Sequence, residues 1–396
     1  MPTSTPAAES PFVPQTVRDC FRGLPDPRVV GRATHALDDI LAIVFLATLA
    51  GCDDFVTMAD YADAKQQWLR ERIGLELRDG IPSHDTWTRV LAALHPDHVL
   101  TAFERLVTLL LRQSPALADR HIAIDGKALR GSKDRGKRMV HLVGAWATQA
   151  GLALGQVPTD EKSNEITAIP KRLDLLDLSG AWVTIDAAGC QKEIAARIVA
   201  QGGDYLLQVK GNQERLHEDV RVLAEAAMEE NLDGLDVWED GSGKKRHGRR
   251  ESRTRFVIDD PDLLKATIRD FELWTELRSV VVTIGEREVD GKTSVETRYH
   301  ISSRAASAAA FGVAVRRHWG IENECHWVLD VAFGEDDHRL REGHAAANLS
   351  VVRRMALSVL KRSKVKLGIK NRRLKASYDN DFLESLLAGV FKDFDA

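Results

Sequence analysis

The sequence predicts an α/β fold in which a helical N-terminal part is followed by a mixed sheet. Two observations support this prediction. Between Phe12 and about Arg112, apolar residues recur every three or four positions, as in amphipathic helices. From His121 onward, short β-like runs and helical segments follow in the order β-β-β-α-β-α-β. Strands that alternate with helices in this way predict a sheet covered by helices.

Length and composition describe an ordinary globular protein with room for two or three domains. The chain has 396 residues, of which 44% are hydrophobic and 29% charged. Its net charge of −4 gives no global sign of nucleic-acid binding, although basic residues gather locally. Four scattered cysteines without a Cys-x-x-Cys pair argue against a zinc or disulfide framework.

No segment of the sequence has the features of membrane insertion or export. The longest apolar run, residues 40–51, is too short to span a bilayer. The N-terminus lacks a basic region followed by an apolar one, and residues 1–15 are expected to form a disordered tail. We therefore expect a cytoplasmic protein without a membrane partner.

The helical part, residues 16–115, contains a candidate DNA-binding element. Ser83 can cap a helix that carries His84, Thr86 and Arg89, and a turn at Gly80 separates this helix from a shorter one. The arrangement fits a helix-turn-helix that reads DNA, and it fits a packed helical hairpin equally well.

Asp125 stands at the end of the first strand, in the stretch HIAIDGKALRGS. Asp-Gly alone is a common hairpin turn, whereas a buried carboxylate needs a partner such as a metal ion. The fourth strand, AWVTIDAAG, leads to Asp186 in a similar way. The order of elements is that of a ribonuclease H-like domain, in which the first and fourth strands are neighbours. Acids at both strand ends therefore favour a shared site over a turn.

The segment 214–299 interrupts the alternation of strands and helices, and its pattern predicts a mostly β insertion. A long helix follows it, from Ala305 to about Leu329. The predicted ribonuclease H-like catalytic domain therefore comprises residues 116–213 and 300–360, and a basic C-terminal segment covers residues 361–396.

The long helix offers a third acid, Glu322. It lies in a polar stripe with His318, His326 and Asp330, which recur every fourth residue. The stripe could be a solvated face, but apolar residues on the adjacent rows predict close packing. These residues are Trp319, Ile321, Trp327 and Val328. A zinc site fits poorly, because the spacing differs from His-Glu-x-x-His.

Several separated stretches agree with one family in their order along the chain. They are IAIDGKALRGS, LGQVPTDEKSNEITAIP, VTIDAAGCQKEIA, DYLLQVKGNQ, HGRRESR, RRHWGIENECHWVLDVAFGEDDHRLR and NLSVVRRMALSVLKR, with GLPDPR and GIPSHDTWTRVL before them. Together they resemble the insertion-sequence transposases of the DDE class, and most of all the subgroup that includes the H-repeat-associated proteins. The resemblance runs from about Phe21 to the end.

The resemblance implies a DNA transposase that cleaves and joins strands with metal ions. Asp125, Asp186 and Glu322 would be its catalytic and metal-binding triad, holding two Mg²⁺ ions for which Mn²⁺ can substitute. Water would first free a 3′ hydroxyl, which would then attack target DNA. The partners would be double-stranded DNA, both terminal inverted repeats and target, and by analogy a second copy of the chain as a homodimer on paired ends. Such a protein would be associated with the nucleoid.

One departure from the family pattern concerns the signature around the third acid. Many related transposases carry Tyr, Arg, Glu and Lys there, whereas this chain has Val315, His318, Glu322 and Leu329. Only the acid matches. The candidates for the missing DNA contacts are Arg316, Arg317, His318, His326 and Arg339.

Local basic clusters are further candidate DNA contacts. Residues 244–255 contain seven Lys or Arg, and residues 361–375 contain eight. An isolated charge run is usually a solvated face, but two runs flanking a carboxylate site predict phosphate contacts. The predicted DNA-binding residues beside the strand ends and in the first run are Lys127, Arg130, Lys210, Gln213, Lys244, Lys245, His247, Arg249 and Arg250.

Two other functions fit the same residues. Another ribonuclease H-like nuclease would share the metal and the triad but would not join DNA ends, and a domesticated copy would bind DNA without catalysis. The third acid also has alternatives, which are Asp330, Glu335, Asp336 and Asp337. Glu322 is preferred because it lies mid-helix, whereas the last three follow Gly334.

Overall fold

The computed structural model divides into two compact units. It describes residues 14–29, 31, 33–113, 120–134, 139–159, 165–241, 249–289 and 291–391. The first unit comprises Met1–Ala116, Leu129–Val140 and Val328–Ala396, and the second comprises Leu117–Ala128 and His141–Trp327. This division differs from the predicted domain boundaries, because the chain after Val328 groups with the N-terminal helices. Most of the expected disordered tail lies outside the described residues.

The first unit is built mainly from helices. They are α1 (Val17–Phe21), α2 (Leu37–Leu49), α3 (Phe55–Ala64), α4 (Gln66–Glu71), α5 (His84–Ala93), α6 (Pro96–Arg112), α13 (Ala345–Arg362), α14 (Ile369–Tyr378) and α15 (Asn380–Ala388), together with α12 (Trp327–Phe333) from its second residue on. The two most deeply buried helices, α2 and α13, pack against each other, and α13 also contacts α5 and α6. None of the helices in the described part of the chain is both long and apolar enough to cross a membrane.

The candidate DNA-reading helix α5 begins as its sequence predicts. The Ser83 side chain accepts a hydrogen bond from the backbone N–H of Thr86, which confirms the predicted cap. His84 and Arg89 are exposed, while Trp87 is fully buried. The helix packs on α3 and α13. One face of α5 is thus buried and the other is exposed, which fits both a packed helical hairpin and a helix-turn-helix that reads DNA.

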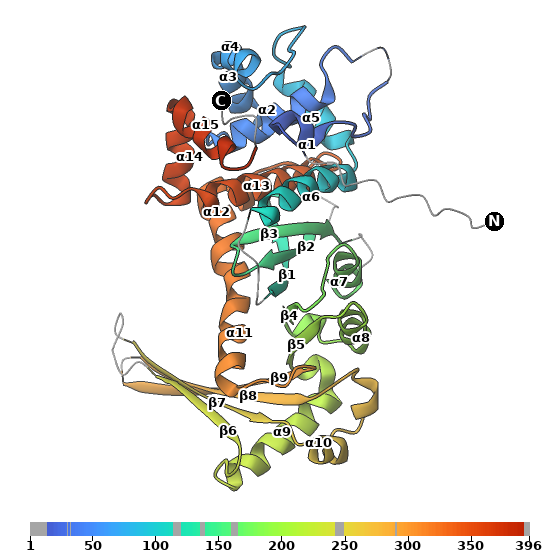
Figure 1. The fold of residues 1–396 in the computed structure, drawn as a ribbon, viewed down its shortest axis with the longest axis vertical. Coiled ribbons are helices and arrows are strands. Elements are labelled where there is room, and N and C mark those ends of the chain that lie inside the picture. Colours follow the sequence, from blue (N-terminus) through green and yellow to red (C-terminus); the bar gives the residue numbers. More distant parts are fainter. Residues whose placement is uncertain are drawn as a thin grey trace, which may run out of the picture. The chain divides into compact units, whose positions relative to one another are not determined.

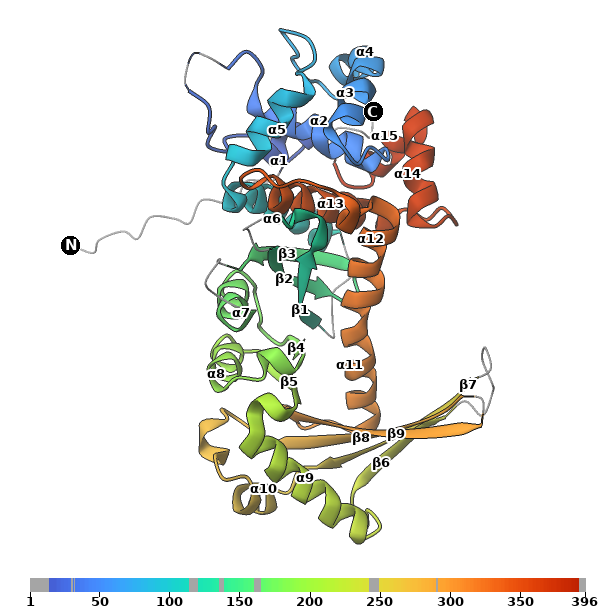
Figure 2. The ribbon, with the colours of Figure 1, turned by 180° about the vertical axis from the view of Figure 1, so that it is seen from behind.

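The second unit is centred on one sheet, drawn in Figures 1 and 2. Among the described residues, nine strands pair in the order β3-β2-β1-β4-β5-β9-β8-β7-β6. Their bounds are β1 (His121–Leu129), β2 (Val140–Ala147), β3 (Leu152–Pro158), β4 (Trp182–Ile185), β5 (Asp204–Val209), β6 (Asp236–Gly241), β7 (Arg249–Ile258), β8 (Ser279–Val289) and β9 (Lys292–Ser302). Strand β1 pairs in parallel with β4, and β4 with β5. The predicted adjacency of the first and fourth strands is confirmed.

The β-rich insertion continues the same sheet. The buried end of β9 pairs antiparallel with β5, from Val209 opposite Tyr299 to Leu206 opposite Ser302. Strands β8, β7 and β6 then add one after another in antiparallel order. Two helices of the insertion, α9 (Glu214–Glu229) and α10 (Pro261–Thr267), lie on one side of these strands in both views.

Helices cover both faces of the sheet in the second unit. On one side lie α7 (Glu165–Asp174) and α8 (Lys192–Ala200), and on the other lies α11 (Ala308–Gly320). The buried side chains of Phe311 and Ala314 on α11 pack against Trp182, Val257 and Val281 of three strands. This apolar contact fixes α11 across the junction between the first strands and the insertion.

The helix predicted over 305–329 is interrupted by a π-helical segment, Ile321–His326, between α11 and α12. The prediction that tryptophans pack this helix tightly is wrong. Trp319 is 48% exposed and Trp327 is 60% exposed, while Ile321 and Cys325 are buried in their place. One extra residue in the π turn rotates the side chains that follow it, Trp327 among them, relative to a regular helix, so the four-residue spacing assigns their face incorrectly. Trp319 precedes the π turn, and its exposure follows from the side of α11 on which it lies.

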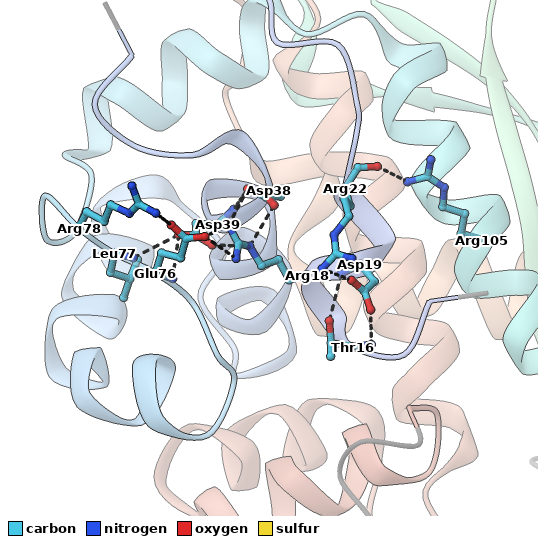
Figure 3. Close-up of polar contacts among 10 residues, drawn as sticks. All are labelled: Thr16, Arg18, Asp19, Arg22, Asp38, Asp39, Glu76, Leu77, Arg78 and Arg105. Atoms are coloured by element: carbon cyan, nitrogen blue, oxygen red, sulfur yellow. Dashed lines mark hydrogen bonds and ion pairs between the residues drawn. The ribbon is translucent and has the colours of Figure 1, made fainter. Parts of the chain in front are cut away.

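A network of three ion pairs around Arg18 joins α1 and α2 to the chain before α5 (Figure 3). The Arg18 Nε atom lies 2.9 Å from Asp38 and 3.0 Å from Asp39, and its Nη1 atom lies 3.1 Å from Glu76. Asp39 is 4% exposed and also accepts hydrogen bonds from the backbone N–H groups of Glu76 and Leu77. Leu77 has a φ of 43°, and these two bonds hold that left-handed turn.

Arg18→Ala is therefore expected to destabilise the protein strongly. The substitution leaves Asp39 buried without its cation, which should lower the free energy of unfolding by about 3 kcal/mol. The matched control is Arg78→Ala, because Arg78 pairs with the same Glu76 but is 82% exposed. Its loss should cost less than about 0.5 kcal/mol. Urea denaturation measures both, and equal losses would contradict a structural role for Arg18.

Candidate active site

Asp125 and Asp186 are placed by the pairing of β1 with β4. The last paired residues of these parallel strands are Ile124 and Ile185, both buried, and each is followed directly by the aspartate. The Asp125 Oδ1 atom accepts a hydrogen bond from the backbone N–H of Gly126 at 2.9 Å. The Asp186 Oδ1 atom accepts one from Ala188 at 3.1 Å and caps a short 3₁₀ turn. Both carboxylates thus occupy the same edge of the sheet.

Glu322 reaches this edge from the π-helical segment, and His326 accompanies it. One carboxylate oxygen of Asp125, one of Glu322 and one ring nitrogen of His326 all lie within 4.8 Å of one another. The His326 Nδ1 atom is 3.5 Å from Asp125 Oδ2 and 3.8 Å from Glu322 Oε2. Glu322 is half exposed, whereas His326 is buried. Segments of π-helix occur often at functional sites, and here the segment carries both side chains.

The carboxyl groups of the cluster influence each other's ionisation. Burial raises the pKa of Asp125 to about 9, and the neighbouring carboxylates of Glu322 and Asp186 add to this shift. The pKa of Glu322 is lowered to about 2 by the adjacent His326 and Asp125 side chains, and the charge of Lys127 adds to this shift. Without a bound cation, Asp125 therefore keeps a proton beside an ionised Glu322. A divalent cation would replace that proton and let both carboxylates ionise.

The cluster fits a divalent metal ion. The Asp125 Oδ2 atom is buried and has no hydrogen-bond partner among the described residues. Carboxylate oxygens are the ligands that Mg²⁺ and Mn²⁺ prefer, and an imidazole nitrogen suits Mn²⁺ better than Mg²⁺. His326 thus lies inside the acid cluster and is buried. Its position suits a metal ligand better than the predicted DNA contact.

Two more predicted DNA contacts lie near the acids. Lys127 is buried on β1, and its charge contributes to the lowered pKa of Glu322. The His318 Nδ1 atom lies 3.0 Å from the hydroxyl of Thr184 on β4, and burial lowers its pKa. Both side chains contribute to the environment of the carboxylates and present little surface to a duplex.

Sequence reasoning did not single out Glu165, a fourth acid at this edge. A Cβ atom on Gly126 would lie 2.0 Å from the Glu165 Oε1 atom, so Gly126 is required for the close approach of this carboxylate. Burial raises the pKa of Glu165, and the charge of Asp186 adds to the shift. The stretch DEKSNEITAIP contains Glu165, but no spacing rule connects it with Asp125.

The other predicted DNA-binding residues have varied surroundings. Lys210 is exposed at the end of β5, whereas Gln213 donates hydrogen bonds to the Cys190 carbonyl and the Gln191 side chain. Arg130 lies 3.4 Å from Asp336, and Arg316 forms an ion pair with Asp240. Arg250 and Arg339 are exposed, and Arg317 is partly so. Lys244, Lys245, His247 and the side chain of Arg249 lie outside the described residues.

Part of the second basic run has a structural role, which corrects its assignment as a set of phosphate contacts. Arg373 is buried, and its guanidinium binds the Asp53 carboxylate at 2.6 Å and the Thr48 carbonyl at 3.0 Å. Arg372 donates to the carbonyls of Leu360 and Val365. These arginines fasten segments of the first unit to one another.

The alternatives for the third acid have partners of their own. The buried Glu335 carboxylate accepts a hydrogen bond from Ser350 at 2.7 Å and pairs with Arg354 at 3.2 Å. Asp336 faces Arg130, as described above. Glu322 is the acid that lies beside Asp125. Its relation to Asp186 is indicated by the influence of both charges on the pKa of His318.

Comparisons with known proteins identify the family of this chain. Residues 116–359 match the model of the transposase DDE domain, and residues 18–107 match that of its associated domain. The H repeat-associated putative transposase YhhI of Escherichia coli (strain K12) is 38% identical over 92% of this chain and 96% of its own length. The putative transposase YncI of Escherichia coli O157:H7 is 38% identical over 94% of this chain and 95% of its own.

Among solved structures, a piggyBac transposase synaptic complex with hairpin DNA covers 93% of this chain and 76% of its own, with a TM-score of 0.39 and 11% identity. That likeness is too low to carry an assignment. The family match covers more than half of the chain, and the relatives are matched over nearly their whole length. The chain belongs to the DDE transposases, in the group of the H-repeat-associated proteins.

Proposed function

We propose that this protein binds the ends of its insertion sequence and catalyses metal-dependent strand cleavage and strand transfer. The observation that carries the proposal is the cluster of Asp125, Glu322 and His326 at the strand edge that also bears Asp186. We assign β1–β5 with their helices to a ribonuclease H-like catalytic domain. The helices of residues 16–115 would be a DNA-binding domain, and double-stranded DNA would be the partner of both.

The proposed metal ligands are the carboxylates of Asp125, Asp186 and Glu322, with Mg²⁺ as the natural ion and Mn²⁺ as its substitute. Bound there, two ions would stabilise charge on the attacking and leaving oxygens of a phosphodiester. The chain itself supplies rigid positioning, since two ligands follow paired strands and the third lies on a packed helix. Lys127 offsets part of the negative charge that the acids gather. The imidazole of His326 completes the ligand set on the side of Glu322.

Removal of a triad carboxylate is expected to abolish cleavage without abolishing DNA binding. Asp125→Asn and Glu322→Gln should each slow cleavage of end DNA by about 1,000-fold or more, a loss of several kcal/mol of transition-state stabilisation. Glu324→Gln is the matched control, because Glu324 lies in the same π-helical segment outside the cluster.

Cleavage and joining of labelled end DNA in Mg²⁺ measure the activity, and gel mobility in EDTA measures binding. Products that carry free 3′ hydroxyl ends and become joined to a target would support transposition. Cleavage without joining would favour the nuclease, and binding without cleavage the domesticated copy. Wild-type cleavage by either triad variant would show that the metal site lies elsewhere.

His326 is expected to contribute to metal affinity. His326→Gln should weaken Mn²⁺ binding by about 10- to 100-fold, the range seen when a side chain that supports a metal site is removed. Calorimetric titration of the DNA-free protein measures the affinity, and electron spin-echo spectroscopy of bound Mn²⁺ reports a coordinated nitrogen. The control is His217→Gln, on α9 and outside the cluster. An unchanged affinity with no nitrogen signal in the wild type would show that His326 is not a ligand.

A further inference from the structure

A row of polar side chains crosses the insertion strands beneath α11. In the strand register, Trp238 of β6 lies opposite Arg255 of β7, Arg255 opposite Thr283 of β8, and Thr283 opposite Arg298 of β9. Residues directly opposite each other project from the same face of a sheet. The adjacent apolar row, with Val257 opposite Val281, packs against α11 and fixes that face as the one below the helix.

One stripe of α11 and the π-helical segment lies over this row. Arg316, Trp319 and Asn323 line a cavity of about 390 Å³ together with the strand residues. The complete lining is Arg253, Arg255, Thr283, Arg298, Val315, Arg316, Trp319 and Asn323. Gly312 lets the helix come this close, because a Cβ atom there would lie 2.6 Å from Trp238 and 2.9 Å from Arg255. We call this cavity the arginine pocket.

Two buried polar groups in the arginine pocket have no partner among the described residues. Arg255 is 2% exposed, and neither its Nε nor its Nη1 atom makes a hydrogen bond there. Thr283, directly opposite, is 5% exposed, and its hydroxyl is likewise unsatisfied. A buried cation without a counter-charge is costly, and so is a buried donor without an acceptor. The cost is explained if the pocket is built for an anion that supplies both.

The other arginines of the pocket are already matched by carboxylates. Ion pairs join Arg253 to Glu251, Arg298 to Glu296 and Arg316 to Asp240. For Arg255, the guanidinium instead stacks over the Trp238 ring at 5.2 Å. Arg255 is therefore the arginine that lacks a direct ion pair in the described part of the pocket, although the more distant Asp240 attracts its charge.

Several basic side chains gather around the arginine pocket. His300 lies two residues after Arg298 on β9 and is buried, which lowers its pKa to about 3. The charges of His318, Arg298, Arg255 and Lys210 add to this shift. Burial also lowers the pKa of Arg255, with contributions from Arg253 and Arg316. The positive potential felt by these groups is the environment that attracts a phosphate.

We propose that the arginine pocket binds one backbone phosphate of the end DNA, close to the scissile bond. Arg255 and Thr283 would donate hydrogen bonds to it from below, and Arg298 and Arg316 would approach it from the rim. Arginine suits this role because its planar donors match phosphate oxygens. The location follows from the chain itself, since Asn323 in the pocket is next to Glu322 in the acid cluster. The inference rests on the proposed function and adds where the substrate's backbone is held.

The first test compares two arginines that are built alike. Arg298 pairs with Glu296 and Arg278 with Glu276, each at 2.8 Å and two residues apart, but only Arg298 lines the pocket. Affinity for a duplex carrying the terminal inverted repeat is measured by fluorescence anisotropy in EDTA at several salt concentrations. Arg298→Gln should reduce the log–log salt slope by about 0.9, the value for one lost phosphate contact. Arg278→Gln should leave it unchanged.

The second test uses Thr283→Val, which keeps the shape of the side chain and removes the hydroxyl. Because that hydroxyl has no partner in the free protein, the melting temperature should stay the same or rise. Affinity for end DNA should nevertheless fall by about 5-fold, as expected for one hydrogen bond to a phosphate. A purely structural threonine would give the opposite pattern, with lower thermal stability and unchanged affinity.

The third test locates the phosphate on the DNA. Methylphosphonate linkages, which are uncharged, are placed one at a time along the strand near the cleavage point. One position should weaken wild-type binding and have no further effect on Arg298→Gln, because the two changes remove the same contact. Additive effects at every position would overturn the proposal.

The outcomes separate this inference from the proposed function. If the wild type binds and cleaves end DNA but Arg298→Gln and Arg278→Gln have equal salt slopes, the arginine pocket is not a DNA site and the transposase assignment stands. If the two salt slopes are equal and inorganic phosphate nevertheless raises the melting temperature of the wild type, the pocket binds free anions only. This result also overturns the proposal. Failure of the wild type to bind end DNA would overturn both.

Discussion

The parallel pairing of β1 with β4 is the constraint on which the rest of the site depends. Buried residues fill the paired positions up to Ile124 and Ile185, so a shift of register would bury an aspartate or expose an isoleucine. With the register fixed, Asp125 lies in β1 beside the point where β4 ends, and Asp186 follows β4 directly. Two like charges held there by packing are unfavourable alone. Burial raises the pKa of Asp125, the neighbouring Glu322 and then Asp186 add to the shift, and a divalent cation would offset this cost.

Helix α11 connects this edge with the insertion. Its apolar side packs on β4, β7 and β8, which belong to both parts of the sheet, and its C-terminal end continues into the π-helical segment with Glu322. A β-rich insertion placed between the second and third acids thus has a structural consequence. It extends the surface on which the helix of the third acid is packed, and so helps to fix the position of that acid.

The sequence predicts the parts of this site that follow from local rules. The Ser83 cap and the neighbouring first and fourth strands are set by periodicity and element order, whereas the predicted end of the first strand at Asp125 is wrong, because β1 continues to Leu129. Burial of charged side chains is set by tertiary packing, which no spacing rule reveals. Arg373 and Arg255 therefore looked like members of solvent-exposed basic runs, and His326 like a surface contact. The exposed Trp327 has a related cause, since the π turn changes the face to which the helix positions after it belong.

The two charged sites on this helix have opposite signs and are complementary to a single substrate. A phosphodiester and the acid cluster repel each other, so DNA can approach the carboxylates only if their charge is neutralised. Arg255, which has no direct ion pair with a described residue, supplies positive charge on one side, and a cation among Asp125, Glu322 and His326 would supply it on the other. Each bound partner lowers the electrostatic cost of the other, which is a coupling free energy between the two sites. An arrangement of this kind would favour metal binding when the strand to be cut is in place, and it would disfavour binding to either partner alone.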